Sequence, residues 1–346
     1  MPEVFYIKVE NRDMKTEKKQ ITIFLLKMWI FIIIFIGLFA VVNKVFLIKS
    51  ENMYNYINYS KQHENSIDIL VLGSSHSMDG IDAKELDLIL LEEYGIAAKS
   101  FNMSITGMRL EQIGYRFKEA LKTQKPSVLI IETFSCAPQS TGTNESINRW
   151  ALDYVPLSKE KVQYIREEIE DNLKTSFGVP FIKYHSRWRE LTKEDWEILS
   201  WEKTWKRSVN QGFIAPDKPN FEGTADDYFE QDFALITEEN VLPENYQEDI
   251  KEIIETCNEI GCKILFLSIP YKVQADFRAE ELVKYNNYLE KQYVDNQNVY
   301  MYDMQKSVQS LQWGYEHMTD EGHVNNLGRA VVNEKLAGEI YKIWEE

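Results

Sequence analysis

Residues 67–77 read IDILVLGSSHS, an apolar run that ends at Gly73 and continues into Ser74 and Ser75. A short aliphatic run closed by a turn residue is typical of a buried strand. A helical pattern follows over residues 82–94. A sharp turn from strand to helix exposes a serine hydroxyl above the sheet, although serine in such a turn also caps helices. This stretch predicts an α/β fold with Ser75 as a candidate nucleophile.

The alternation of strand and helix recurs along the chain. Further strands are predicted at residues 98–105, 127–134, 262–269 and 299–304, and further helices at 109–122, 245–260, 279–294 and 326–344. Strands that alternate with helices of this length form a parallel sheet covered on both faces. We therefore predict a three-layer α/β/α sandwich, in which a ligand would lie beyond the carboxyl ends of the strands.

Residues 135–244 do not follow this alternation. They hold five of the eight tryptophans, which are Trp150, Trp188, Trp196, Trp201 and Trp205. Because a structureless loop of this length is rare in a compact domain, we predict a partly helical insertion over the active-site edge. The indoles either pack this insertion or stack on sugar rings, since tryptophan serves in both roles.

A long apolar segment lies close to the N-terminus. Residues 21–43 read ITIFLLKMWIFIIIFIGLFAVVN, with Lys27 as the single charge, and about 20 such residues cross the hydrocarbon core of a bilayer. Five basic residues precede the segment and two closely follow it: Lys8, Arg12, Lys15, Lys18 and Lys19, then Lys44 and Lys49. This asymmetry places the N-terminus in the cytoplasm. No small-residue cleavage site follows, so an uncleaved, single-pass anchor is favoured over a signal peptide.

These signals divide the chain into four parts. Residues 1–20 are expected in the cytoplasm, 21–48 in the membrane, 49–66 as a polar stalk, and 67–346 as an extracytoplasmic domain that contains the insertion. Beyond residue 50, 31 Lys and Arg are outnumbered by 51 Asp and Glu, which gives a net charge of −20. Such an acidic domain argues against nucleic acid or anionic lipid as a surface partner.

Metal and cofactor signatures are absent from the sequence. It has no Walker, dinucleotide-binding, zinc or calcium motif, so neither a cofactor nor a metal is expected. The three cysteines, Cys136, Cys257 and Cys262, match no zinc or redox spacing. A local disulfide between the last two is conceivable, but buried free thiols are favoured.

Two further segments place functional residue types at the ends of predicted elements. Asn102 and Gly107 follow the second strand, and Gly107 could turn its N–H toward an oxygen held near Ser75. Asp320 and His323 precede the last helix, and an Asp three residues before a His can orient the imidazole as a general base. The combination predicts a catalytic centre of Ser75, Asp320 and His323, with the N–H groups of Ser75 and Gly107 as the oxyanion hole.

These motifs resemble the blocks of the SGNH, or GDSL-type, hydrolase superfamily. The matching blocks are Gly73–Ser75, Asn102–Gly107 and Asp320–His323. The family carries its serine in a Gly-Asp-Ser block after the first strand, with Gly-Ser-Ser as a variant, so the likeness places the nucleophile on Ser75 and puts Ser74 at the Asp position. It implies a flavodoxin-like α/β/α fold and serine esterase or acyltransferase chemistry.

The likeness covers residues 67–134 and 245–346 and departs from the family after the third strand. The family usually carries an Asn there that completes the oxyanion hole, whereas residues 131–136 read IETFSC. The missing Asn is shared by a branch that includes the D-alanyl transfer protein of teichoic acids and the alginate O-acetylation proteins. Those proteins similarly combine one N-terminal anchor with an extracellular domain, and they act with a multi-spanning membrane-bound O-acyltransferase.

Five residues are candidates for substrate binding: Ser74, His76, Asn102, His185 and Arg187. His76 follows the candidate nucleophile and either lines the pocket or caps the helix. His185 and Arg187 belong to a polar-aromatic cluster of the insertion, YHSRW. That cluster is either a structural contact or a site for an anionic or sugar group, because arginine binds phosphate and carboxylate well.

The leading hypothesis is serine-dependent O-acyl transfer on an extracellular cell-envelope polysaccharide or teichoic-acid-like polymer, through an acyl-Ser75 intermediate. A carbohydrate or lipid esterase has the same chemistry, with water in the second step. A non-catalytic scaffold subunit of an envelope-modifying membrane complex is the third alternative. The implied partners are the glycopolymer, or another acylated substrate, and a multi-spanning membrane-bound O-acyltransferase.

Overall fold

The chain forms two compact units, which are described separately. The computed structural model describes residues 3–138, 145–197, 199, 211–212, 231–274, 277–294 and 298–345. One unit, here the anchor unit, combines residues 1–48 with 179–204. The other, here the α/β unit, combines residues 49–178 with 205–346. The predicted insertion is therefore divided between the two units.

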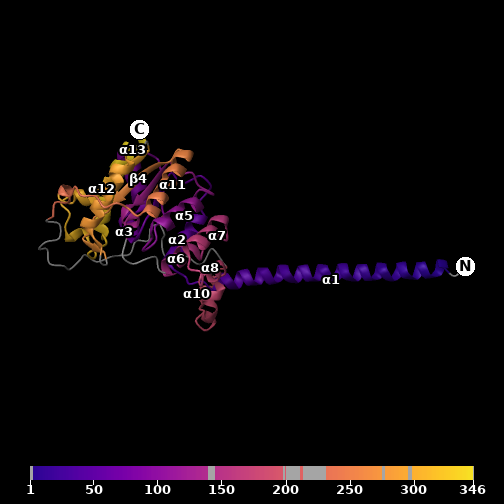
Figure 1. Cartoon of the computed structure of the whole chain (residues 1–346). Helices are drawn as coiled ribbons and strands as arrows, with labels where there is room; N and C mark the ends of the chain where they lie inside the picture. Colours follow the sequence, from indigo (N-terminus) through magenta and orange to yellow (C-terminus); the bar gives the residue numbers. More distant parts are fainter. Residues whose placement is uncertain are drawn as a thin grey trace. The chain divides into compact units, whose positions relative to one another are not determined.

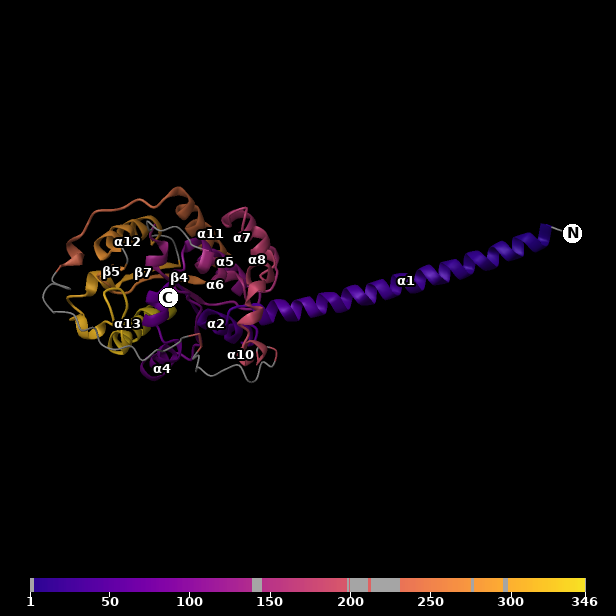
Figure 2. The same ribbon diagram turned by 90° about the horizontal axis from the view of Figure 1, so that it is seen from below.

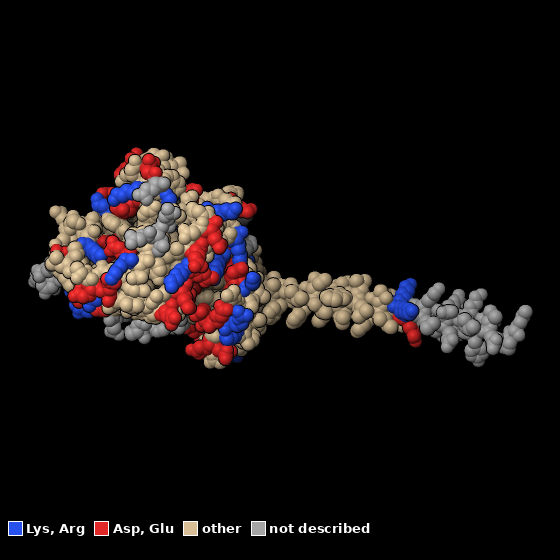
Figure 3. All heavy atoms as spheres, turned by 45° about the horizontal axis from the view of Figure 1, so that its top comes forward, with Lys and Arg blue, Asp and Glu red and all other residues tan. Residues whose placement is uncertain are grey.

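The anchor unit is built on one long helix, α1 (Glu3–Phe46). Residues 16–46 are long and apolar enough to cross a membrane, and none of their most apolar stretch is buried. The face of α1 in Figure 3 carries charged side chains only toward its N-terminal end. Three short helices complete the unit: α9 (Phe181–Tyr184), η2 (His185–Arg189) and α10 (Lys193–Glu197).

A five-stranded parallel sheet forms the centre of the α/β unit, as predicted. Its order is β2-β1-β3-β4-β7, with β1 at Ile69–Leu72, β2 at Ser100–Asn102, β3 at Val128–Glu132, β4 at Lys263–Ser268 and β7 at Val299–Asp303. All four pairings are parallel. A separate antiparallel pair joins β5 (Val273–Gln274) to β6 (Phe277–Arg278). The first three strands in the chain, β1, β2 and β3, are thus neighbours in the sheet, and their carboxyl ends lie at the same edge.

Helices cover both faces of the sheet, which confirms the three-layer arrangement (Figures 1 and 2). The main helices are α4 (Ala83–Tyr94), α5 (Leu110–Ala120), α11 (Glu244–Ile260), α12 (Ala279–Tyr293) and α13 (Asn326–Glu345). Their bounds differ from the predicted ones by two residues or fewer. The reason is local: Asp82 caps the start of α4, while glycines in the left-handed conformation, Gly95 and Gly261, end α4 and α11.

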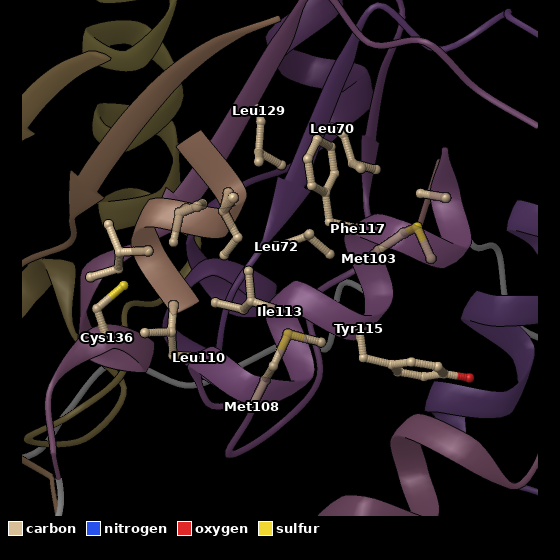
Figure 4. Packing of buried hydrophobic residues seen from close by; sticks show 14 of the residues in the cluster. Leu70, Leu72, Met103, Met108, Leu110, Ile113, Tyr115, Phe117, Leu129 and Cys136 are labelled. Carbon is tan, nitrogen blue, oxygen red and sulfur yellow. The ribbon is translucent and has the colours of Figure 1, made fainter. Parts of the chain in front are cut away.

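Alternate residues of the strands enter two separate cores. Leu70 and Leu72 of β1 pack with α5 and α11 on one face (Figure 4). Ile69 and Val71 pack with α4 and α13 on the other. All four side chains are fully buried, which explains why this strand reads as a continuous apolar run instead of an alternating one.

The segment 49–66 is not a stalk, in contrast to the prediction. It contains α2 (Glu51–Ser60), whose residues Asn52, Met53, Asn55, Ile57 and Tyr59 are buried in the α/β unit. The Asn55 amide donates to the carbonyl of Asn102 at 3.0 Å, and the Tyr59 hydroxyl donates to the carbonyl of Ala120 at 3.0 Å. These partners lie far along the chain, so the polar composition that suggested a solvated stalk reflects buried hydrogen bonds.

The insertion is partly helical, as expected. In the α/β unit it forms α6 (Glu145–Leu152), α7 (Lys159–Glu168) and α8 (Lys174–Gly178). Trp150 packs partly buried against the core. Trp188 and Trp196 belong to the anchor unit and are 61% and 54% exposed. The segment around Trp201 and Trp205 lies outside the described residues.

The three cysteines are free and buried. Cys257 is the last buried residue of α11. The backbone N–H of Cys262 donates to the carbonyl of Cys257 at 2.8 Å. The favoured interpretation of buried thiols agrees with this arrangement.

Truncating Met53 tests the packing of α2. Met53 is fully buried, so Met53→Ala should lower the free energy of unfolding by about 2–5 kcal/mol, because it removes buried apolar surface and leaves a cavity. Urea unfolding of the full chain in detergent would measure this loss. The control is Leu88→Ala on α4, where Leu88 is 49% exposed, with an expected change below about 1 kcal/mol. Equal, small effects of the two substitutions would contradict the packing of α2 and would support the predicted stalk.

Candidate active site

The turn after β1 places Ser75 at the carboxyl edge of the sheet. Strand β1 ends at Leu72, and α3 (Ser75–Gly80) begins three residues later with Ser74 as its N-cap. Ser75 is thus the first helical residue, and first-turn N–H groups have no acceptor within the helix. Its side chain lies close to the surface, with the residue 8% exposed. This is the strand–turn–helix arrangement that the sequence predicted for the serine.

Ser75, His323 and Asp320 form a continuous hydrogen-bonded chain. The Ser75 Oγ lies 2.8 Å from His323 Nε2. On the other side of the ring, His323 Nδ1 lies 3.0 Å from Asp320 Oδ1 and 3.1 Å from Oδ2. The predicted contact between the serine and the imidazole is therefore present, and it joins residues separated by 248 positions. A hydroxyl, an imidazole and a carboxylate in this order are the groups needed to deprotonate a serine.

Asp320 also shapes the turn on which His323 lies. Its Oδ1 accepts the backbone N–H groups of Gly322 and His323, both at 2.8 Å. Burial raises the pKa of the Asp320 carboxyl, but hydrogen bonds from the His323 ring and from these two N–H groups outweigh that effect and lower it to about 2. The carboxyl therefore stays ionised at neutral pH and holds Nδ1 protonated, which leaves Nε2 to accept a proton from Ser75.

The helix that follows, α13, fixes this turn to the serine turn. The Asn325 amide donates to the carbonyls of Glu316 and Met318 at 2.7 and 3.0 Å. Arg329 Nε donates to the carbonyl of Asp79 in α3 at 2.7 Å. Asn325 thus braces the segment before His323, and Arg329 connects α13 to α3. Sequence analysis did not identify either residue.

Glu132 is a buried carboxyl group of the site, and it was missed by sequence analysis. It ends β3 and has no exposed surface. Its Oε2 accepts the Ser74 hydroxyl at 2.7 Å and the Ser74 N–H at 3.3 Å, and its Oε1 accepts the Phe134 N–H at 2.7 Å. Glu132 therefore holds the serine turn from the neighbouring strand. A single acidic residue in an apolar strand was the available signal.

Gly73 is required by close packing. A Cβ at this position would lie 2.4 Å from Ser77 Oγ and 2.5 Å from Glu132 Cβ. Sequence analysis attributed this glycine to the conformational demands of a tight turn, but Gly73 does not have a positive φ. The reason for glycine is the approach of β3 and α3 to the same backbone position.

Ser74 and Asn102 are positioning residues, which corrects their assignment to substrate binding. Both are 1% exposed. The Asn102 amide donates to the carbonyls of Ser77 and Ile81 at 2.8 and 3.0 Å, and its Oδ1 accepts the N–H of Ser104 at 3.1 Å. With Ser74 bonded to Glu132, the polar atoms of both side chains hold α3 in place.

His76 packs beneath the site in an aromatic group. Its ring stacks on Phe134 at 4.3 Å between centroids, meets Tyr271 edge-on at 4.9 Å, and lies 5.4 Å from the ring of His323. The residue is 1% exposed. His76 therefore supports the wall behind the catalytic imidazole instead of standing on the open surface.

Gly107 adopts the left-handed conformation, with φ of +71°. A Cβ there would also lie 2.8 Å from Ile147 Cδ1, so the approach of α6 adds to the need for glycine. Its loop follows β2, the strand beside β1. The position is compatible with the predicted oxyanion role of its N–H.

His185 and Arg187 lie in the other unit from Ser75, and their predicted role in substrate binding stays a prediction. Both belong to the anchor unit. His185 Nδ1 lies 2.8 Å from the carbonyl of Ile182, and Arg187 donates to the carbonyl of Leu47 at 2.9 Å and pairs with Asp195 at 3.2 Å. Their side chains serve local contacts in that unit. In the part of the chain that the structure describes, no group of three or more His, Cys, Asp or Glu could hold a metal ion.

Two solved structures are similar to this chain. One, from Bacteroides fragilis and described provisionally as an acylhydrolase, is 10% identical with a TM-score of 0.40, over 85% of this chain and 100% of that one. The other, from Parabacteroides merdae and described provisionally as a GDSL-like lipase, is 12% identical with a TM-score of 0.37, over 82% and 98%. No family model and no curated protein matches the sequence.

Glu132 is expected to make stability depend on pH. Burial raises the pKa of its carboxyl from 4.5 to about 7, even though the hydrogen bonds from Ser74 and Phe134 act in the opposite direction. Between these values the folded state keeps a proton that the unfolded state has lost. Stability from this group is therefore highest below pH 4.5 and falls until about pH 7, by on the order of 3 kcal/mol.

Glu132→Gln removes this titration, so the variant should gain stability relative to the unsubstituted chain as pH rises from 4.5 to 7.5. Urea unfolding of both at each pH gives the difference. Glu255→Gln, on the exposed side of α11, is the matched control and should follow the unsubstituted chain. A Glu132→Gln difference that is the same at both pH values would contradict the assignment.

Proposed function

We propose that this protein is a serine-dependent acyl-transferring enzyme of the SGNH hydrolase type. The observation that carries the proposal is the chain from Ser75 Oγ through both ring nitrogens of His323 to the Asp320 carboxylate. The family resemblance of the three sequence blocks supports it. Buried carboxylate and glycine contacts around Ser74 further support it, because they fix the serine in one position.

In the proposed first step, Ser75 Oγ attacks an acyl ester carbonyl while His323 Nε2 takes the hydroxyl proton. The carbonyl oxygen becomes an oxyanion, which the N–H groups of Ser75 and Gly107 would stabilise. Collapse of this intermediate breaks the ester bond, and His323 returns the proton to the departing alcohol. Asp320 remains ionised throughout and stabilises the imidazolium.

In the second step, a hydroxyl group attacks the acyl-Ser75 ester with His323 again accepting the proton. The bond between the acyl carbon and Ser75 Oγ then breaks, and His323 returns the proton to Ser75. We propose that the acceptor is a hydroxyl of an extracellular cell-envelope polysaccharide or teichoic-acid-like polymer. A multi-spanning membrane-bound O-acyltransferase would supply the acyl group. With water as acceptor, the same site is an esterase. Glu132 stands in place of the usual Asn and bonds inward to Ser74, so the proposed oxyanion hole has one donor fewer, at a cost on the order of 10²–10³ in rate.

We also propose that α1 anchors the protein and that the α/β unit is extracytoplasmic. The apolar stretch of α1 is unburied, and basic residues are concentrated before it. The end of α1 is held by later parts of the chain: the Phe181 N–H donates to Asn43 Oδ1 at 2.7 Å. A helix that packs with residues 181–197 has a structural role after translocation, which supports an uncleaved anchor over a removed signal sequence.

Substitution of Ser75 tests the enzyme proposal. Ser75→Ala and His323→Ala should each lower labelling by a fluorophosphonate probe, and release of p-nitrophenol from p-nitrophenyl acetate, by about 10³-fold or more. The double variant should be no worse than either single one, because the two groups act as a unit. The full chain in detergent is the right sample, since residues 181–197 pack on α1.

Ser310→Ala changes an exposed serine and is the matched control, with activity expected at the level of the unsubstituted chain. Thermal unfolding should show that all variants remain folded. A folded chain that is never labelled, and whose cellular role survives Ser75→Ala, would leave the scaffold alternative standing.

Competition between acceptors separates transfer from hydrolysis. With p-nitrophenyl acetate as donor, addition of a chito-oligosaccharide or of polyglycerol phosphate should yield an acetylated polymer faster than free acetate, because the acyl-enzyme partitions to the better-bound hydroxyl. Mass spectrometry of the polymer and an assay for acetate give the two rates, with Ser75→Ala as the blank. Free acetate as the sole product with either acceptor would favour the esterase.

A further inference from the structure

The part of the insertion that belongs to the anchor unit, residues 181–197, packs against the C-terminal end of α1. The ring of Phe181 meets the rings of Phe39 and Phe46 edge-on, with centroids 5.7 and 5.2 Å apart. Its N–H donates to Asn43 Oδ1 at 2.7 Å. Arg187 donates to the carbonyl of Leu47 at 2.9 Å, where the helix has ended. Figure 1 shows α10 beside this same end of α1.

These contacts fix the level of the segment along α1. The apolar residues from Ile21 to Val42 span about 33 Å at 1.5 Å per residue, which matches a hydrocarbon core of about 30 Å. Val42 therefore marks the boundary of the core in a spanning helix. Phe39 lies one turn inside this boundary and Phe46 one turn outside, so Phe181, which contacts both, lies at the boundary itself.

The segment presents large apolar side chains to its surroundings at this level. Ile182 is 46% exposed, Trp188 61%, Trp196 54% and Leu199 41%. The ion pair between Arg187 and Asp195, at 3.2 Å, holds the two tryptophan-bearing helices η2 and α10 together. These four large apolar side chains lie within one short segment, and two of them are tryptophans, whose ring with a polar edge is typical of the membrane–water interface.

The segment carries equal numbers of basic and acidic side chains, as is suitable for the headgroup region of a membrane. Lys183, Arg187, Arg189 and Lys193 are balanced by Glu190, Glu194, Asp195 and Glu197. The guanidinium of Arg189 lies over the Trp188 ring, 4.6 Å from its centroid. The segment thus combines apolar side chains with paired charges and has no net charge, so its binding would come from apolar insertion and not from attraction to anionic lipid.

We propose that residues 181–197 and Leu199 form a collar that lies in the outer headgroup region of the membrane around the end of α1, with Ile182, Trp188, Trp196 and Leu199 inserted among the lipids. The inference rests on the proposed membrane anchoring of α1. A protein partner in the membrane is the other conceivable cover, but continuity with the boundary of the lipid-exposed helix favours lipid. The collar would hold the C-terminal end of α1 at a constant depth where the helix leaves the bilayer.

Fluorophores at single cysteines of the full chain test the collar. An NBD group would be attached at Ile182→Cys in the collar, Ile34→Cys near the middle of the apolar stretch, and Leu235→Cys, which is 76% exposed on the α/β unit. The three native cysteines are buried, so the unsubstituted chain serves as a check for unwanted labelling. The chain would be reconstituted into phosphatidylcholine vesicles, with or without one quarter phosphatidylglycerol, that carry 5-doxyl or 12-doxyl lipid.

The collar predicts stronger quenching by 5-doxyl than by 12-doxyl lipid at position 182, the reverse order at position 34, and little lipid quenching at position 235. Phosphatidylglycerol should change these values little. Adding Trp188→Asp and Trp196→Asp should lower shallow quenching at position 182 several-fold, without changing the quenching at position 34 or the fluorophosphonate labelling of Ser75.

The outcomes separate the collar from the anchor. A label at position 34 that lipid does not quench would overturn the anchoring and the collar together. Quenching at position 34, with position 182 open to aqueous iodide, would overturn the collar alone. A label at position 182 shielded from both iodide and lipid would show that protein, and not lipid, covers the segment, and would also overturn the collar.

Discussion

The hydrogen bonds of one buried carboxylate decide the geometry of the serine turn. Glu132, at the end of β3, accepts the hydroxyl and the N–H of Ser74 in the neighbouring turn and the N–H of Phe134 in its own. Gly73 lets the two backbones approach, because any side chain there would collide with Glu132 and Ser77. An unpaired buried carboxylate would be costly, so the turn that satisfies Glu132 also fixes where Ser75 begins α3.

The other two site residues, Asp320 and His323, come from the C-terminal part of the chain and are held by a different set of hydrogen bonds. Asp320 closes its own turn by accepting two N–H groups, and the same carboxylate orients the His323 ring. Arg329 then ties α13 to α3 through the carbonyl of Asp79. Two independently braced turns therefore meet at the 2.8 Å contact between Ser75 and His323.

The insertion has separate roles in the two units. Its first part extends the α/β unit with α6 to α8 and brings Ile147 against Gly107 beside the site. Its second part belongs to the anchor unit, where Phe181 and Arg187 hold the last turns of α1. One insertion therefore contributes packing to both units.

The sequence by itself determined the parallel α/β/α fold and the strand–turn–helix position of Ser75, because apolar periodicity and turn residues are local signals. It also brought Ser75, Asp320 and His323 into one predicted site, since parallel strands end at a common edge. Tertiary structure decided what depends on contacts between distant segments: the burial of α2, the inward bonds of Ser74 and Asn102, the bracing by Glu132, and the placement of His185 and Arg187 in the anchor unit. Polarity in a sequence looks the same whether its partner is water or a buried carbonyl, so only the folded chain distinguishes them.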